Sequence, residues 1–169
     1  MRKPTVQMCL AFAALVAAVL LVVVPVRAGE LTPEASAALQ QARSEFKADR
    51  EKLLEDNLDL TAGQAGRFWP IYREFAARRA ALGDQQLDLI VDYAKAYPSV
   101  SETVARNLVA RSLKVDRQAA ELRERYAKKL GKVLTGPQLM RFLQIERRID
   151  NLVQLEVQGV VPIVDLPAQ

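Results

Sequence analysis

The chain has 169 residues, half of them hydrophobic, with a formal net charge of +4, no histidine and one cysteine, Cys9. Without histidine, Ser-His-Asp and Cys-His catalysis is excluded, and a zinc, copper or nickel site would lack imidazole ligands. The chain also contains neither a P-loop nor a Gly-x-Gly-x-x-Gly motif. The composition therefore predicts a single-domain protein that is not an enzyme and that carries no metal and no cofactor.

The N-terminal segment has the pattern of an export signal. Two basic residues precede an uncharged stretch over residues 4–26, and Val26-Arg27-Ala28 is typical of a cleavage site. We therefore expect residues 1–28 to be a signal peptide and residues 29–169 to form a single helical domain in the periplasm. The alternative is an uncleaved membrane anchor, because the apolar run is long enough to span a bilayer. Contact with a membrane is expected only through this segment, if it is retained.

Removal of residues 1–28 changes the charge balance. Lys plus Arg falls from 24 to 21 while Asp plus Glu stays at 20, so the net charge becomes +1. Cys9 leaves with the signal, and no disulfide is expected. The near-neutral remainder does not indicate a nucleic-acid partner.

The rest of the chain has the periodicity of four helices, each preceded by an apolar residue and then Thr or Ser. These starts are Leu31-Thr32, Leu60-Thr61, Val100-Ser101 and Leu134-Thr135. Apolar residues recur every three or four positions after each start, which predicts helices over residues 33–57, 62–96, 102–132 and 136–158. The expected fold class is all-α: four amphipathic helices, with two long central ones, in an elongated hairpin or cradle-like bundle.

The second of these helices contains a proline. Pro70 cannot donate a hydrogen bond to the carbonyl of Gly66, so a kink is expected there, or a short first segment followed by a restart. The aromatic residues around it are expected to be buried, because large aromatic side chains usually are. They are Phe68, Trp69, Tyr72 and Phe75.

An internal repeat carries the most specific motif of the chain. Leu60-Thr61-Ala62-Gly63-Gln64 returns as Leu134-Thr135-Gly136-Pro137-Gln138, and the sixteen-residue stretches from 60 and 134 share seven identities. A Thr followed three residues later by Gln is a capping box, and the preceding Leu occupies the hydrophobic staple position. The residues of this helix-capping motif are Leu60, Thr61, Gln64, Leu134, Thr135 and Gln138.

This doubled Leu-Thr-x-x-Gln, in a small helical chain behind an export signal, resembles the Spy/CpxP family of periplasmic LTxxQ proteins over about residues 50–158. The stretch Arg67-Phe68-Trp69-Pro70-Ile71-Tyr72 resembles a divergent branch of that family. The resemblance implies an ATP-independent, stress-protective chaperone that binds unfolded clients on helical surfaces, often as a homodimer. The alternative that it implies is a signalling accessory that binds the periplasmic region of a sensor kinase. Metal-binding relatives use histidine and cysteine ligands, which residues 29–169 lack.

A basic flank is the candidate surface for clients or a partner. Residues 101–133 contain nine basic and four acidic residues. Five bases lie beside the apolar stripe of the third helix: Arg111, Lys114, Arg125, Lys129 and Lys132. The competing interpretations are a solvated helix face, or neutralisation within the fold by first-helix acids such as Glu45, Asp49 and Glu55. The apolar tail over residues 160–166 is expected to dock on the domain or on a partner subunit.

Overall fold

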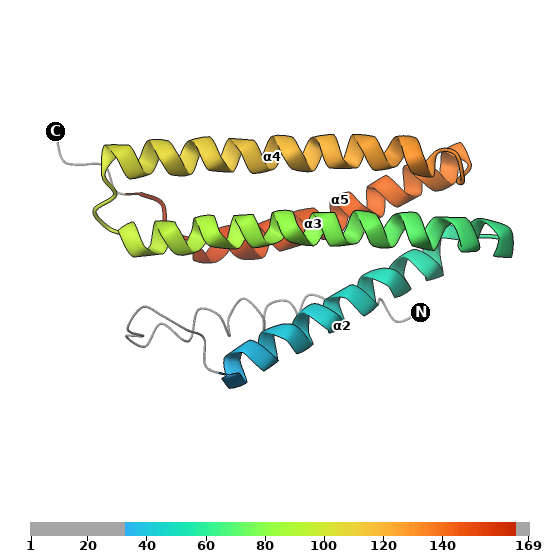
Figure 1. The fold of residues 1–169 in the computed structure, drawn as a ribbon, viewed down its shortest axis with the longest axis horizontal. Coiled ribbons are helices and arrows are strands. Elements are labelled where there is room, and N and C mark those ends of the chain that lie inside the picture. The colour runs from blue at the N-terminus through green and yellow to red at the C-terminus, as the bar shows by residue number, and fades with distance from the viewer. Residues whose placement is uncertain (1–32, 165–169) are drawn as a thin grey trace. The chain divides into compact units, whose positions relative to one another are not determined.

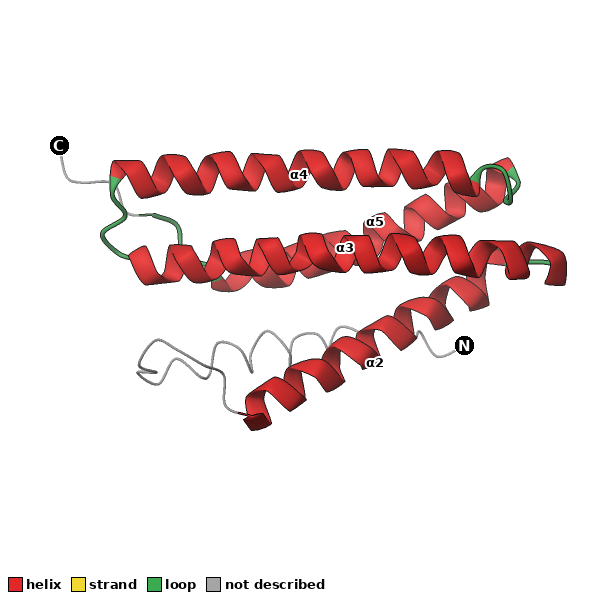
Figure 2. Ribbon diagram, in the orientation of Figure 1, coloured by secondary structure: helices red, strands yellow, loops and turns green. Residues whose placement is uncertain are grey.

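The structure, a computed structural model, describes residues 33–164. The predicted signal segment, the start at Leu31-Thr32 and the end of the tail lie outside these residues. Four helices are present: α2 (Pro33–Leu58), α3 (Ala62–Ala96), α4 (Glu102–Leu130) and α5 (Gly136–Val160). No strand occurs between residues 33 and 164 (Figure 2). The all-α prediction is confirmed, with α3 (35 residues) and α4 (29 residues) as the two longest helices.

Local capping explains why the helices begin where they do. Thr61 and Ser101 both have extended backbone angles, and their hydroxyls accept from the N–H groups three residues later. Between α2 and α3, Asp59 has a φ of 48°, a left-handed conformation that Asp tolerates better than most residues. α4 ends two residues earlier than predicted, because residues 131–134 form a turn in which Leu134 N donates to Leu130 O at 2.8 Å.

The chain divides into two compact units. One contains α3, α4, residues 136–143 of α5 and residues 161–164. The other contains α2 and residues 144–160 of α5. We call the first one the hairpin unit and the other the second unit.

The hairpin unit is built on α3 and α4, which run antiparallel beside each other (Figure 1). Its buried apolar residues lie on one face of each helix and on the segment that follows α4. They are Phe68, Tyr72, Phe75 and Leu82 of α3, Val115, Leu122, Tyr126 and Leu130 of α4, and Leu134 and Phe142 beyond them. The ring of Phe142 lies 5.9–6.3 Å from those of Phe68, Tyr72 and Phe75. The expectation that the aromatic residues form core is confirmed for these three α3 residues, while Trp69 is half-buried with its ring 5.0 Å from that of Phe68.

The expected restart of the helix at Pro70 is wrong, because α3 continues through Pro70 from Ala62 to Ala96. Both Pro70 and Gly66 are exposed. The Gly66 carbonyl that loses its helical donor is therefore open to hydration, which offsets the missing hydrogen bond.

The second unit packs α2 against the later part of α5. Leu54, Leu58 and Ile149 are buried in it, together with two charged residues, Arg50 and Glu146. These two charged side chains were not anticipated as core, and they are considered with the polar contacts below.

Candidate functional site

The two copies of the Leu-Thr-x-x-Gln motif form the same local structure. At the first, Thr61 Oγ1 accepts from Gln64 N at 3.3 Å, while Thr61 N donates to Gln64 Oε1 at 3.1 Å. At the second, the corresponding distances between Thr135 and Gln138 are 3.4 and 3.0 Å. Each motif therefore caps its own helix with both bonds of a capping box.

The motif copies also bind each other, which the sequence did not indicate. Gln64 Nε2 donates to Gln138 Oε1 at 2.8 Å, and Gln138 Nε2 donates back to Gln64 Oε1 at 3.3 Å. Gln64 Nε2 also lies 3.2 Å from the carbonyl oxygen of Val133. Four residues on, the repeat-related Phe68 and Phe142 meet edge to face, with centroids 6.1 Å apart. Identical positions of the repeat thus contact one another, in the reciprocal manner of a two-fold interface.

This pairing explains why both copies carry glutamine. Either Glu or Gln completes a capping box, because the box needs only an acceptor oxygen. The reciprocal pair needs a donor as well, which an amide has and a carboxylate lacks. Glutamine is therefore the residue that can cap and cross-link at the same position.

We expect Gln64→Glu to preserve the cap of α3 and still destabilise the hairpin unit by about 1–3 kcal/mol, the cost of leaving part-buried polar partners unsatisfied. Gln138 Oε1 would then lose the hydrogen bond from Gln64 Nε2, and the carbonyl oxygen of Val133 would lose its bond from the same amide. Urea unfolding followed by circular dichroism measures the change.

Thr135→Ala is the matched comparison, because it removes a cap and leaves both amides in place; it should cost about 0.5–2 kcal/mol. The double variant Gln64→Glu with Gln138→Glu should be less stable than either single variant, since two carboxylates would oppose each other. A double variant as stable as the native chain would show that the amide pair contributes nothing.

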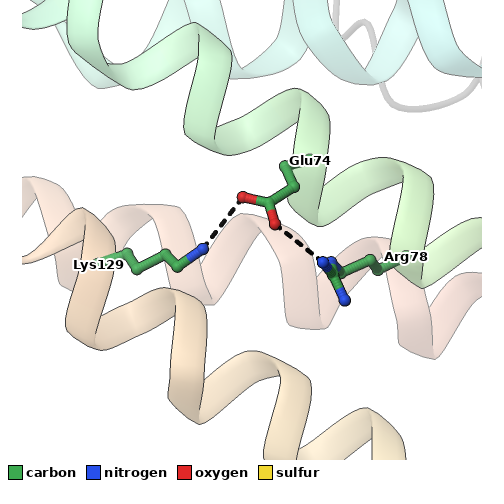
Figure 3. A network of polar contacts seen from close by, with 3 residues as sticks. All are labelled: Glu74, Arg78 and Lys129. Atoms are coloured by element: carbon green, nitrogen blue, oxygen red, sulfur yellow. Dashed lines mark hydrogen bonds and ion pairs between the residues drawn. The ribbon is translucent and has the colours of Figure 1, made fainter.

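Two bases of the basic flank form ion pairs with acidic residues of α3. Arg111 Nη1 lies 2.7 Å from Asp92 Oδ2, and Lys129 Nζ lies 3.0 Å from Glu74 Oε2. Figure 3 shows the second contact, in which Arg78 of α3 also binds the Glu74 carboxylate, at 3.1 Å. The anticipated internal neutralisation thus occurs for these two bases, but its acids come from α3 and not from the first helix.

The environment of Glu74 stabilises its charged form. The neighbouring Tyr126 hydroxyl, the Lys129 ammonium and the Arg78 guanidinium together lower the pKa of Glu74 from its ordinary value of 4.5 to about 2. Burial and the same carboxylate raise the pKa of Tyr126. The Lys129 ammonium also lies 4.6 Å from the centre of the Tyr126 ring, close enough for a cation–π contact. Glu74, Tyr126 and Lys129 therefore join α3 to α4 through one polar cluster.

The lowered pKa sets the pH range over which this cluster stabilises the hairpin unit. Because the folded pKa of Glu74 lies below the unfolded value, its contribution is complete above about pH 5 and is lost as the pH falls through 4.5 toward 2. The difference in melting temperature between the native chain and Glu74→Gln should accordingly be constant at neutral pH and shrink in acid. Glu121→Gln is the control, because Glu121 is exposed on α4 and has no base within ion-pair distance among the described residues. Identical pH profiles for the two variants would contradict a role for Glu74 between helices.

The other three bases of the flank are in a different situation. Lys114, Arg125 and Lys132 are exposed, and among the described residues none has a carboxylate within ion-pair distance. The flank thus divides into an inner pair that holds α3 to α4 and an outer set of three. Of the five bases of the flank, these three have no ion partner among the described residues.

The second unit contains a buried ion pair that sequence reasoning missed. Arg50 Nε donates to Glu146 Oε1 at 3.1 Å, and Arg50 Nη2 donates to Glu146 Oε2. Arg50 is 9% exposed and Glu146 1%. A signal was present, because each residue follows an apolar stripe residue by four positions, Phe46 in α2 and Phe142 in α5. A charged residue at a core position indicates a buried partner.

Neither a metal-ligand cluster nor a membrane-spanning stretch is found in the part of the chain that the structure describes. Within residues 33–164, no three acidic side chains gather where they could hold a metal ion. Nor does any of the helices α2 to α5 include an apolar stretch long enough to traverse a bilayer. Comparisons with protein-family models, with curated proteins and with solved structures find no significant match.

Apolar side chains are exposed where the hairpin unit turns from α3 to α4. The Tyr93 hydroxyl donates to the carbonyl of Pro162 at 2.8 Å, which holds the tail beside α3, and the Tyr93 and Tyr97 rings lie 5.9 Å apart. Exposed apolar residues flank this contact on both helices and on the tail. They are Val91, Tyr97, Val104, Ile163 and Val164. We call this group the apolar tip.

Proposed function

We propose that this protein is exported to the periplasm and acts there as an ATP-independent, chaperone-like or stress-protective protein. In this proposal the hairpin unit binds unfolded clients through its helical surfaces. The observation that carries it is the combination of the apolar tip with the free cations Lys114, Arg125 and Lys132 on the same unit. The resemblance of the doubled motif to Spy/CpxP proteins supports the same conclusion.

The physical argument concerns what an unfolded client offers. An unfolded chain exposes apolar side chains in no fixed order, so a holding surface needs adaptable apolar contact more than positioned groups. The five residues of the apolar tip supply such contact, and Ile163, at 89% exposed, is the most accessible of them. The three free cations on the same unit attract acidic client segments and favour fast encounter.

Aggregation suppression tests the proposal directly. The protein should suppress aggregation of two unrelated unfolding clients without a nucleotide, with its oligomeric state measured alongside to detect a homodimer. Binding of one sensor domain, with no protection of either client, would favour the signalling accessory and overturn the chaperone proposal.

Charge reversal tests the assignment of the cations. Lys114→Glu, Arg125→Glu and Lys132→Glu together should weaken client binding and its salt dependence. The melting temperature should change little, because these side chains pair with no acid between residues 33 and 164.

The matched control reverses the inner pair instead. Arg111→Glu with Lys129→Glu would place like charges opposite Asp92 and Glu74 and should lower the melting temperature. The triple variant at Lys114, Arg125 and Lys132 could instead lose stability while each folded molecule binds clients normally. That result would show that these cations stabilise the fold and do not form a binding surface.

A further inference from the structure

The outward face of α4 carries a second surface, separate from the apolar tip. Over residues 106–117, one side of the helix exposes bases and aliphatic residues at helical spacing: Arg106, Val109, Ala110, Leu113, Lys114 and Arg117. Val109 and Leu113 are each 59% exposed, one turn apart on the side of α4 opposite Val115 and Leu122, which are buried. We call these six residues the outer stripe.

The outer stripe lies on the more basic of the two units. Residues 103–120 contain four bases and one acid. Residues 60–143, which make up most of the hairpin unit, contain fifteen bases and eight acids, whereas residues 33–59 and 144–160 contain six bases and ten acids. Lys114 and Arg117 have no carboxylate within ion-pair distance among the described residues, while Arg106 pairs with Glu102 on its own helix. The near-zero net charge of residues 29–169 therefore conceals a strongly basic unit that would be drawn to an anionic surface.

We propose that the outer stripe docks the hairpin unit on an anionic lipid bilayer. Val109 and Leu113 would enter the boundary between headgroups and acyl chains, and Lys114 and Arg117 would bind the lipid phosphates. This is the chemistry of a helix that lies in the plane of a membrane interface: aliphatic residues bordered by bases. The contact is independent of residues 4–26 and would add a second membrane signal if that segment is retained.

The geometry favours a bilayer over a protein partner. A protein interface needs a well-packed apolar core of several residues, and the outer stripe offers two large aliphatic side chains on a single convex helix. A bilayer accepts isolated protruding side chains and presents its charges without a fixed register. About 17 Å of helix separates Arg106 from Arg117, so the stripe can contact several headgroups at once.

A fluorescent probe at Leu113 tests the proposal in the full chain. Cys9→Ser removes the only cysteine, and Leu113→Cys then carries an environment-sensitive fluorophore. The control places the same fluorophore at Met140, which is also 59% exposed but lies in α5. The emission of the probe at position 113 should shift to the blue on vesicles that contain half phosphatidylglycerol, and it should not shift on pure phosphatidylcholine vesicles. The emission of the probe at position 140 should not shift on either kind of vesicle. This readout reports contact of α4 with lipid whether or not residues 4–26 also enter the vesicle.

Neutralising the bases completes the test. Each base near an anionic surface raises the ratio of docked to free protein about fivefold. Lys114→Gln with Arg117→Gln should therefore reduce this ratio, read from the probe, roughly 25-fold. Four outcomes would overturn the proposal: no shift at position 113, an equal shift at 140, an equal shift on neutral vesicles, or persistence of the shift in the double variant. A shift that grows with protein concentration in the absence of vesicles would overturn it too, and would assign the stripe to a second copy of the chain.

Discussion

Arg50→Met should destabilise the unit formed by α2 and residues 144–160 of α5 by about 3–5 kcal/mol, because it removes the guanidinium that binds both oxygens of the buried Glu146 carboxylate. Glu146→Leu should have a similar effect, since Arg50 is nearly as buried. Urea unfolding, combined with hydrogen exchange of the α2 amides, separates the response of this unit from that of the hairpin unit.

Two further variants make this prediction specific. Arg50→Met combined with Glu146→Leu replaces the pair by apolar side chains and should recover most of the loss, because neither charge is then left unpaired. Lys52→Met, on the same helix, breaks an exposed pair with Asp56 and should cost less than about 1 kcal/mol. If Lys52→Met lowers the free energy of unfolding as much as Arg50→Met does, burial is not the reason that the Arg50–Glu146 pair stabilises this unit.

Phe142→Ala should destabilise the hairpin unit by about 3–5 kcal/mol, the usual cost of truncating a buried phenylalanine. Its ring is 1% exposed and meets those of Phe68, Tyr72 and Phe75, so the three α3 aromatic residues would line a cavity. Thermal unfolding of the variant measures the loss.

Met140→Ala is the control, because it truncates a side chain two residues away that is 59% exposed, and it should change stability by no more than about 0.5 kcal/mol. Phe142→Leu should fall between the two, since it keeps an apolar side chain in the core. Equal effects of Phe142→Ala and Met140→Ala would mean that the aromatic cluster does not hold the hairpin unit together.

The helices themselves follow from local sequence. Ala62 and Gly136 were predicted as first residues from Thr61 and Thr135, and the structure begins α3 and α5 there. A cap acts on N–H groups within one turn of its own residue, so neighbouring residues are sufficient to locate it. The burial of Phe68, Tyr72 and Phe75 was predictable for a related reason, because their spacing places them on one face of a helix.

The polar contacts between helices were decided only by the tertiary structure. Gln64 and Gln138 are 74 residues apart in the chain, and Arg50 and Glu146 are 96 apart. Helical periodicity shows which face of its own helix each residue occupies, but not which residue of another helix lies opposite, because that depends on how the helices pack. The same limit applies to the basic flank: sequence placed Lys114 and Lys129 on one side of α4. Only the tertiary structure shows that Glu74 of α3 pairs with Lys129, whereas no carboxylate of the described residues lies within ion-pair distance of Lys114.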